Sequence, residues 1–225
     1  NLLVPSPRDY RKMRLPSAML TLGDVQAIAH DNAHGLAATT LSLGVPVAYA
    51  GGPLHLEQAL QALQSRAAQA VNNGHSILIL DDQGVSARQA AIPSLLAVSA
   101  VHHHLIRQGL RSKTSLLVVS AEPIDAHHMA VLLGYGANAI CPWLAHALCP
   151  DGLSIDRYHR AIDKGLLKIM SKMGISVLQS YIGAQIFDAV GLHAEVIDAY
   201  FPGTSSPVGG LRLADIETDI RARHA

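Results

Sequence analysis

Short apolar runs alternate with amphipathic stretches along most of this chain. Mostly apolar runs, typical of strands buried on both faces, occupy residues 45–49, 77–80, 116–119, 137–141 and 175–178. Apolar residues that recur every three or four positions predict helices over 56–71, 93–109, 126–133, 155–173 and 183–190. Five strand–helix pairs in succession favour an α/β fold built on a parallel sheet with flanking helices. A closed eightfold barrel needs about 250 residues, so we expect a partial or incomplete (β/α) barrel-like sheet.

The chain divides by its pattern into three segments. Residues 1–40 are interrupted by proline and glycine and carry several basic residues, which predicts an N-terminal lead-in segment on the surface. Residues 41–201 hold the repeating pattern and form the expected α/β domain. Residues 202–225 begin with a Gly/Ser/Pro loop and end in a short polar helix, a C-terminal arm. The sequence does not begin with methionine, so we keep open that it is a piece of something larger.

Composition narrows the choice of partners and compartment. The 225 residues are 49% hydrophobic, and 17 basic residues balance 17 acidic ones. No net field therefore draws the chain to nucleic acid or to an anionic membrane. No apolar stretch reaches the roughly 18 residues of a membrane span, and two cysteines predict a reducing, cytoplasmic compartment.

The histidines do not show the spacing of a metal site. Residues 102–104 are three consecutive histidines inside the predicted helix 93–109, where neighbours point about 100° apart. His102 shares an apolar stripe with Leu105, which predicts a half-buried, hydrogen-bonded side chain. The two histidines at 127–128 are also consecutive and point in different directions on a helix, so we expect no metal ligands here.

Other candidate motifs are weak. Residues 134–139 read G-x-G-x-x-A, but these glycines close a helix and precede a strand, which is the reverse of a nucleotide-binding loop. Cys141 and Cys149 are too far apart for a CxxC pair, so we expect ordinary thiols. Asp81 and Asp82 end a strand, where α/β enzymes place catalytic groups, and are weak candidates.

A basic stripe marks the long helix at 155–173. Lys164, Lys168 and Lys172 lie four residues apart on one side. The stripe is either a solvated face opposite the core or a surface that meets an acidic partner domain. Residue chemistry alone gives no catalytic constellation.

Several long strings resemble the central domain region of the glutamate synthase large (alpha) subunit. They are residues 92–98, 100–107 and 132–139, and above all 158–187, YHRAIDKGLLKIMSKMGISVLQSYIGAQIF. The resemblance covers roughly residues 55–216. It implies a parent enzyme in which an amidotransferase domain releases ammonia from L-glutamine. The ammonia reaches an FMN domain with a 3Fe–4S cluster, where 2-oxoglutarate becomes L-glutamate.

The resemblance also implies what this segment does. The central domain links the amidotransferase and FMN domains of the same chain, borders the ammonia route, and binds neither FMN nor the cluster itself. We therefore expect no catalytic, cofactor or metal residues. The surface expected to meet other domains or the ammonia route comprises Lys164, Lys168, Ser171, Lys172, Ser176, Gln179, Ser180 and Gln185.

The chain departs from the family's pattern at three arginines. Gln83, Ile182 and Pro207 stand where the family has arginine, and Cys141-Pro142-Trp143 replaces its usual N-P-Y. An uncharged side chain cannot make arginine's bidentate contacts. Two alternatives to a scaffold domain of a glutamate synthase thus stay open. One is a stand-alone, diverged binding protein, which could form homo-oligomers, and the other is a small enzyme that uses Asp81, Asp82 or the histidines.

Overall fold

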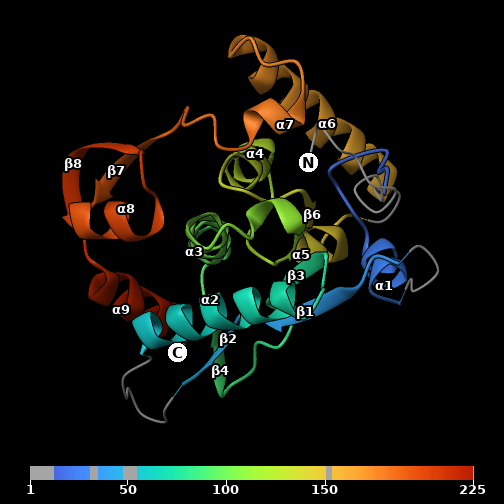
Figure 1. Ribbon diagram of the computed structural model, residues 1–225. Coiled ribbons are helices and arrows are strands. Elements are labelled where there is room, and N and C mark those ends of the chain that lie inside the picture. Colours follow the sequence, from blue (N-terminus) through green and yellow to red (C-terminus); the bar gives the residue numbers. More distant parts are fainter. Residues whose placement is uncertain (1–12, 31–34, 48–54, 151–153, 225) are drawn as a thin grey trace.

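The computed structural model describes residues 13–30, 35–47, 55–150 and 154–224, and Figure 1 shows the arrangement of their elements. In chain order the elements are α1 (Leu22–His30), β1 (Ala38–Ser42), β2 (Gly44–Pro46), α2 (Leu56–Asn72), β3 (Ile77–Asp81), β4 (Gln89–Ala91), α3 (Ser94–Arg107), η3 (Arg111–Lys113), β5 (Ser115–Val119), α4 (Ala126–Gly134), β6 (Ala139–Cys141), α5 (Trp143–Ala147), α6 (Ile155–Lys172), α7 (Leu178–Tyr181), β7 (Asp188–Leu192), α8 (Ala194–Tyr200), β8 (Ser205–Leu211) and α9 (Leu213–His224).

The centre of the fold is a parallel sheet in the order β1-β3-β5-β6. Ile77 of β3 pairs with Ala38 of β1 on one side and with Ser115 of β5 on the other. The chain around Met19 extends the sheet beyond β6 through a parallel bridge to Ile140. The strands do not close into a barrel, so the expected α/β fold with an incomplete parallel sheet is confirmed.

Both faces of this sheet are buried, as the continuous apolar strands predict. Leu78 and Leu80 of β3 face the larger core, which includes apolar residues of α2, α3, α4 and α6. Ile77 and Ile79 face the opposite way, toward a smaller core with α1 and the residues before it. Each buried Leu or Ile contributes about 1.5–3 kcal/mol relative to an exposed one, so a one-residue slip in register would be costly.

The predictions hold best for the middle of the chain. Helices α2, α3, α4 and α6 begin and end within about two residues of the expected ranges, and β3 and β5 agree equally well. The apolar stripe predicted for the first of these helices is buried along its whole length, at Leu56, Leu60, Leu63, Ala67 and Val71.

Two predictions after α6 are wrong. Residues 175–178 are not a strand, because Ser176 and Val177 are exposed and the helix α7 starts at Leu178. Residues 183–190 are not a helix, because Gly183 and Gln185 have φ values of +77° and +53°, which no right-handed helix accepts. The strand β7 takes up the end of that range instead.

The two ends of the chain are more structured than the pattern predicts. Val25 and Ile28 of α1 are buried, and β1 spans residue 40, so the described part of the lead-in belongs to the sheet and its cores. Residues 205–211, expected as a loop, form β8, which pairs in parallel with β7. The division into three segments stays a prediction, although its first boundary falls inside β1. The expected strand 45–49 is described only to residue 47, and β2 there pairs with β4.

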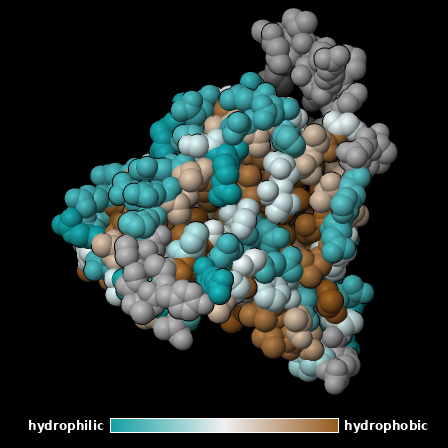
Figure 2. Space-filling view, turned by 90° about the horizontal axis from the view of Figure 1, so that it is seen from below, coloured by the Kyte–Doolittle hydropathy of each residue, from teal (hydrophilic) through white to brown (hydrophobic). Residues whose placement is uncertain are grey.

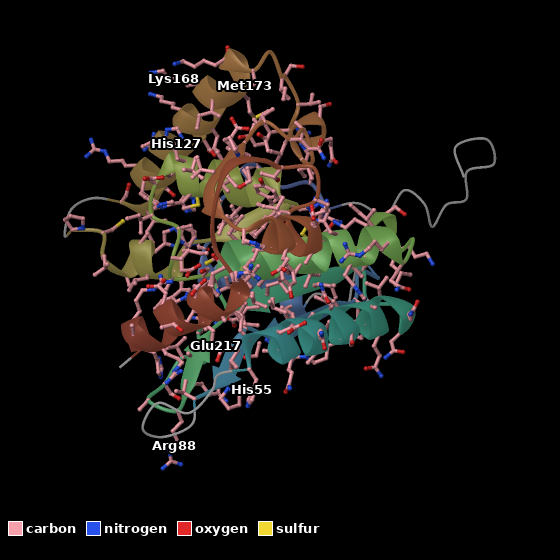
Figure 3. All side chains as sticks on the ribbon, turned by 90° about the vertical axis from the view of Figure 1, so that its left-hand side faces the viewer. His55, Arg88, His127, Lys168, Met173 and Glu217 are labelled. Atoms are coloured by element: carbon pink, nitrogen blue, oxygen red, sulfur yellow. The ribbon has the colours of Figure 1, made fainter. Side chains whose placement is uncertain are left out.

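The C-terminal helix returns to the body of the molecule. Glu217 of α9 accepts a hydrogen bond from the backbone N–H of Leu56 at the start of α2, over 3.0 Å. Ile220 of the same helix is buried. Figure 3 shows Glu217 near His55, at the end of the molecule opposite α6. The predicted arm is thus packed against the domain.

Candidate functional site

The carboxyl edge of the sheet, where α/β enzymes place their chemistry, is organised around Asp82. This residue is buried, with 3% of its surface exposed. One oxygen, Oδ2, accepts hydrogen bonds from Ser120 Oγ at 2.6 Å and from the Ala121 N–H at 2.9 Å. The other oxygen, Oδ1, accepts from Trp143 Nε1 at 2.7 Å. Asp82 therefore ties the ends of β3 and β5 to the start of α5.

Asp81 differs from its neighbour in environment. Its side chain accepts one hydrogen bond, from the Gln83 N–H at 2.8 Å. Burial raises the pKa of the Asp81 carboxyl, the Gln83 N–H opposes this, and the adjacent Asp82 raises the pKa further. Neither aspartate has a hydrogen bond to a histidine, lysine or cysteine in the described part of the chain. The contacts of both carboxylates are those of a structural strand end.

FMN and a 3Fe–4S cluster, the groups that the resemblance implies for a parent enzyme, do not fit this edge. A flavin phosphate needs free N–H groups or cations, whereas Asp82 presents a carboxylate here. Iron–sulfur clusters are held by several thiolates. Cys141 is buried in β6, and burial, followed by Asp24 and Asp81, raises the pKa of its thiol to about 12. Cys149 is the second and last cysteine of the chain. This donor set suits neither FMN nor a 3Fe–4S cluster.

His102 is the buried, hydrogen-bonded histidine that the sequence predicts. Its Nδ1 accepts from Arg111 Nε at 2.9 Å. Burial, followed by the charges of Arg111 and His103, lowers the pKa of His102 to about 3, so the imidazole is neutral. Arg111 also donates to the Gly136 carbonyl and to Asn138 Oδ1, at 2.8 and 3.0 Å. It thus joins the end of α3 to the turn between α4 and β6.

The glycines at 134–136 end a helix, as predicted. Gly136 has φ +123°, and a Cβ atom there would lie 2.3 Å from the His102 Nδ1. A Cβ at Gly134 would lie 2.6 Å from the Phe187 ring. Both glycines therefore serve close packing at the end of α4.

Sequence reasoning missed a pair of histidines that are in direct contact. The Nε2 atoms of His146 in α5 and His159 in α6 lie 2.9 Å apart. Burial, followed by His159, lowers the pKa of His146 to about 4, and burial lowers that of His159. One ring donates to the other in the neutral pair. Among the residues that the structure describes, no three His, Cys, Asp or Glu side chains gather as metal ligands.

Seven of the predicted contact residues come from α6 and the segment after it, and we call the exposed side chains of residues 164–180 the α6–α7 surface. It holds the exposed apolar side chains Leu167, Met173 and Val177, which are 64%, 50% and 53% exposed. Its exposed polar members are the predicted Lys164, Lys168, Ser171, Lys172, Ser176, Gln179 and Ser180. Figure 3 shows Lys168 and Met173 at the same end of α6, at the periphery of the molecule.

The opposite side of α6 is anchored in the core. Ile162, Leu166 and Met170 are buried. A Cβ at Gly165 would lie 2.5 Å from Ala126 Cβ of α4, so the two helices approach closely. Such close packing fixes the direction in which the α6–α7 surface points.

Gln185, the last predicted contact residue, lies elsewhere. It follows α7 and lines a pocket with residues of α3, α4 and the turn before β8. The predicted set therefore divides into two places.

Figure 2 shows the molecule from below. On this face hydrophilic and hydrophobic residues are interspersed.

The fold and these sites define an open parallel α/β domain whose strand-end carboxylate has structural partners. The sequence profile of the glutamate synthase central domain matches residues 1–193, and the chain belongs to this family. It is 40% identical over 238 residues to the glutamate synthase [NADPH] large chain of Bacillus subtilis, covering 100% of this chain and 15% of that one.

Another relative supports membership of the same family. Ferredoxin-dependent glutamate synthase 2 of Synechocystis sp. is 40% identical over 249 residues, covering 100% of this chain and 16% of that one. This chain thus spans about 15% of the length of these relatives. Among solved structures, DHODH of Eimeria tenella in complex with ferulenol superposes with a TM-score of 0.48 and 14% identity, over 67% of this chain and 38% of that one.

In the part of the chain that the structure describes, no helix combines the length and the hydropathy of a membrane span.

Proposed function

We propose that this chain is the non-catalytic central domain of a glutamate synthase that makes L-glutamate from L-glutamine and 2-oxoglutarate. In this proposal it links the amidotransferase and FMN domains of the same parent chain and borders the ammonia route. FMN and the 3Fe–4S cluster are held by the parent enzyme outside this segment. The cytoplasmic compartment expected from the two cysteines stays a prediction.

The observation that carries the proposal is the α6–α7 surface. Leu167 is exposed on α6, whose other side is packed in the core, and Met173 and Val177 are exposed in the segment that joins α6 to α7. Exposed apolar groups rimmed by polar ones mark interaction sites. The stems of the lysines add apolar area, and their charges suit an acidic neighbour.

A second candidate is the stand-alone, diverged binding protein. The observation in its favour is the loss of three family arginines at Gln83, Ile182 and Pro207. Without these guanidinium groups, contacts between domains lose charge-assisted hydrogen bonds. Such a protein would keep the fold without the partner domains.

The size of the native gene product separates the two candidates. An antibody raised against this chain is used to blot an extract of the source cells. The scaffold proposal requires a band several times heavier than 23.8 kDa, the mass of this chain. A band near 23.8 kDa contradicts it and supports the stand-alone protein.

A pair of surface variants then tests the α6–α7 surface in the native enzyme. Leu167→Ser should lower glutamine-dependent glutamate formation about threefold or more while leaving ammonia-dependent formation unchanged, because only the former needs domain coupling. Val85→Ser is the matched control, since Val85 is 48% exposed in the loop between β3 and β4. Equal effects of the two substitutions, or an equal loss of both activities, contradict the role of this surface.

A further inference from the structure

Two histidines from different helices direct ring nitrogens at each other. His146 lies on α5 and His159 on α6, and their Nε2 atoms are 2.9 Å apart. The two rings are tilted by 49°, with 4.9 Å between their centroids. Both side chains are only partly buried, so neither is sealed from solvent.

The spacing of these nitrogens is close to that of two imidazoles on one metal ion. Zinc binds histidine nitrogen at about 2.0–2.1 Å with tetrahedral angles, which places two such nitrogens about 3.3 Å apart. A small rotation of either side chain widens the observed 2.9 Å separation to this value. Neither ring has another hydrogen bond with a described residue. The orientation of the rings therefore suits a shared ion as well as a shared proton.

Neighbouring contacts hold both rings in this orientation. The Tyr158 ring meets His146 edge-on, with 5.7 Å between centroids and 87° between the planes. The Tyr158 hydroxyl in turn donates to the Ile124 carbonyl over 3.0 Å. His159 is carried by α6, whose buried residues anchor it in the core. Groups that are held in place before a ligand arrives lose less entropy when it binds.

The charges around the pair favour a cation. Burial lowers the pKa of His159, and three carboxylates oppose this through their negative charge. They belong to Asp163 and Asp156 on α6 and to Asp24 on α1. Burial, followed by the charge of His159, lowers the pKa of His146 to about 4. Both rings are therefore neutral at pH 7, which is the form of imidazole that binds a metal.

We propose that His146 and His159 bind one divalent transition-metal ion, represented by zinc, through their Nε2 atoms, with water completing the coordination. Imidazole nitrogen suits zinc, copper and nickel, whereas magnesium and calcium prefer oxygen ligands. Structural and catalytic zinc sites have four or three protein ligands, and no third His, Cys, Asp or Glu joins this pair among the described residues. The site therefore holds an exchangeable ion, and it does not depend on the proposed scaffold role.

The test is zinc binding to the native, full-length protein, measured by equilibrium dialysis. His146→Gln and His159→Gln should each weaken one zinc-binding step about tenfold or more, because loss of even an outer contact of a metal site costs about 10–100-fold in affinity. His127→Gln is the matched control, since His127 is exposed on α4 and lies outside the pair. It should leave this binding step unchanged, and magnesium should not compete with zinc.

A second measurement at pH 5.5 separates this site from zinc held by ordinary surface histidines. A histidine with a pKa of about 6.5 is mostly protonated at that pH and releases its metal. His146, with a pKa of about 4, stays neutral, so the zinc that depends on it should remain bound.

Circular dichroism checks that each variant is folded, and either histidine variant alone decides the outcome. Unchanged zinc binding in His146→Gln or His159→Gln would overturn the proposal. An equal loss in the His127→Gln control, or release of the ion at pH 5.5, would also overturn it.

Discussion

Replacing Asp82 with alanine should destabilise the fold far more than the same change at Asp81. The two residues are adjacent and chemically identical, but only Asp82 is almost fully buried. Its carboxylate accepts three hydrogen bonds, from Ser120 Oγ, the Ala121 N–H and Trp143 Nε1. Asp81 accepts one, from the Gln83 N–H in an exposed turn.

The expected loss of stability in Asp82→Ala follows from the hydrogen-bond donors that the substitution leaves without an acceptor. Hydrogen bonds to a charged group contribute about 1.5–3 kcal/mol each, and effects within one network are not additive. The Ser120 hydroxyl can rotate, whereas the Ala121 and Trp143 N–H groups are fixed. We therefore expect Asp82→Ala to lower the free energy of unfolding by about 3–5 kcal/mol, in the range of broken buried networks.

In the control, Asp81 has two opposing effects on stability at pH 7. Because burial raises the pKa of Asp81 above that of the unfolded chain, its contribution to stability is present at low pH and is lost as pH rises through the folded-state pKa. At pH 7 the ionised group is thus slightly unfavourable. Asp81→Ala loses one exposed hydrogen bond and this penalty together, so stability should change by less than about 1 kcal/mol.

Urea unfolding at pH 7 measures both variants. Trp143 is the single tryptophan of the chain and donates to Asp82, so its fluorescence also reports directly on the carboxyl edge. Circular dichroism in the far ultraviolet provides a second probe of the same transition. If Asp82→Ala costs no more than Asp81→Ala, the hydrogen-bonded role of Asp82 is wrong.

Two further predictions concern histidines and glycines. The pKa of His146 is about 4, below its unfolded value of 6.5. The stability from the neutral His146–His159 pair is therefore present above pH 6.5 and lost as pH falls toward 4. Urea titrations at pH 7.0 and 4.5 measure how much the free energy of unfolding falls between the two pH values. The variant His146→Gln should reduce this fall by about 1 kcal/mol, a figure that already allows for solvent screening. An unchanged pH dependence of stability would contradict the prediction. Gly136→Ala should cost about 3 kcal/mol or more in thermal unfolding, because of its φ and the contact with His102. Gly109→Ala, with φ +66° and nothing within 4 Å of its Cβ, should cost about 1 kcal/mol, and similar costs for the two would refute the packing argument.

The sequence predicted those elements whose determinants are local. The stripe from Leu56 to Val71 needs only a periodicity of 3.6 and a core on one side, so α2 appears where expected. The strand β3 is apolar at four successive positions and is buried on both faces. The helix stop at Gly136 could also be predicted, because the order of helix, glycines and strand is visible in the pattern.

The failures have non-local causes. The range 183–190 reads as a helix, but β7 pairs in parallel with β8, whose first residue is 17 positions after that of β7. Such a pairing leaves little trace in the spacing of single residues. The Trp143–Asp82 hydrogen bond joins residues 61 positions apart, and the contact between His146 and His159 is visible only once α5 and α6 are placed.

The contacts in the structure explain part of the chain's departure from the family's sequence pattern. Two of the altered segments, residues 81–84 and 141–143, meet at the carboxyl edge of the sheet, where Trp143 donates to Asp82 over 2.7 Å. An indole N–H can only donate, so this tryptophan suits a carboxylate acceptor and closes the edge with a charge-assisted hydrogen bond. The carboxylate at this strand end therefore serves to hold the sheet together. Binding is therefore better sought away from the strand ends, at the α6–α7 surface, where Leu167, Met173 and Val177 are exposed.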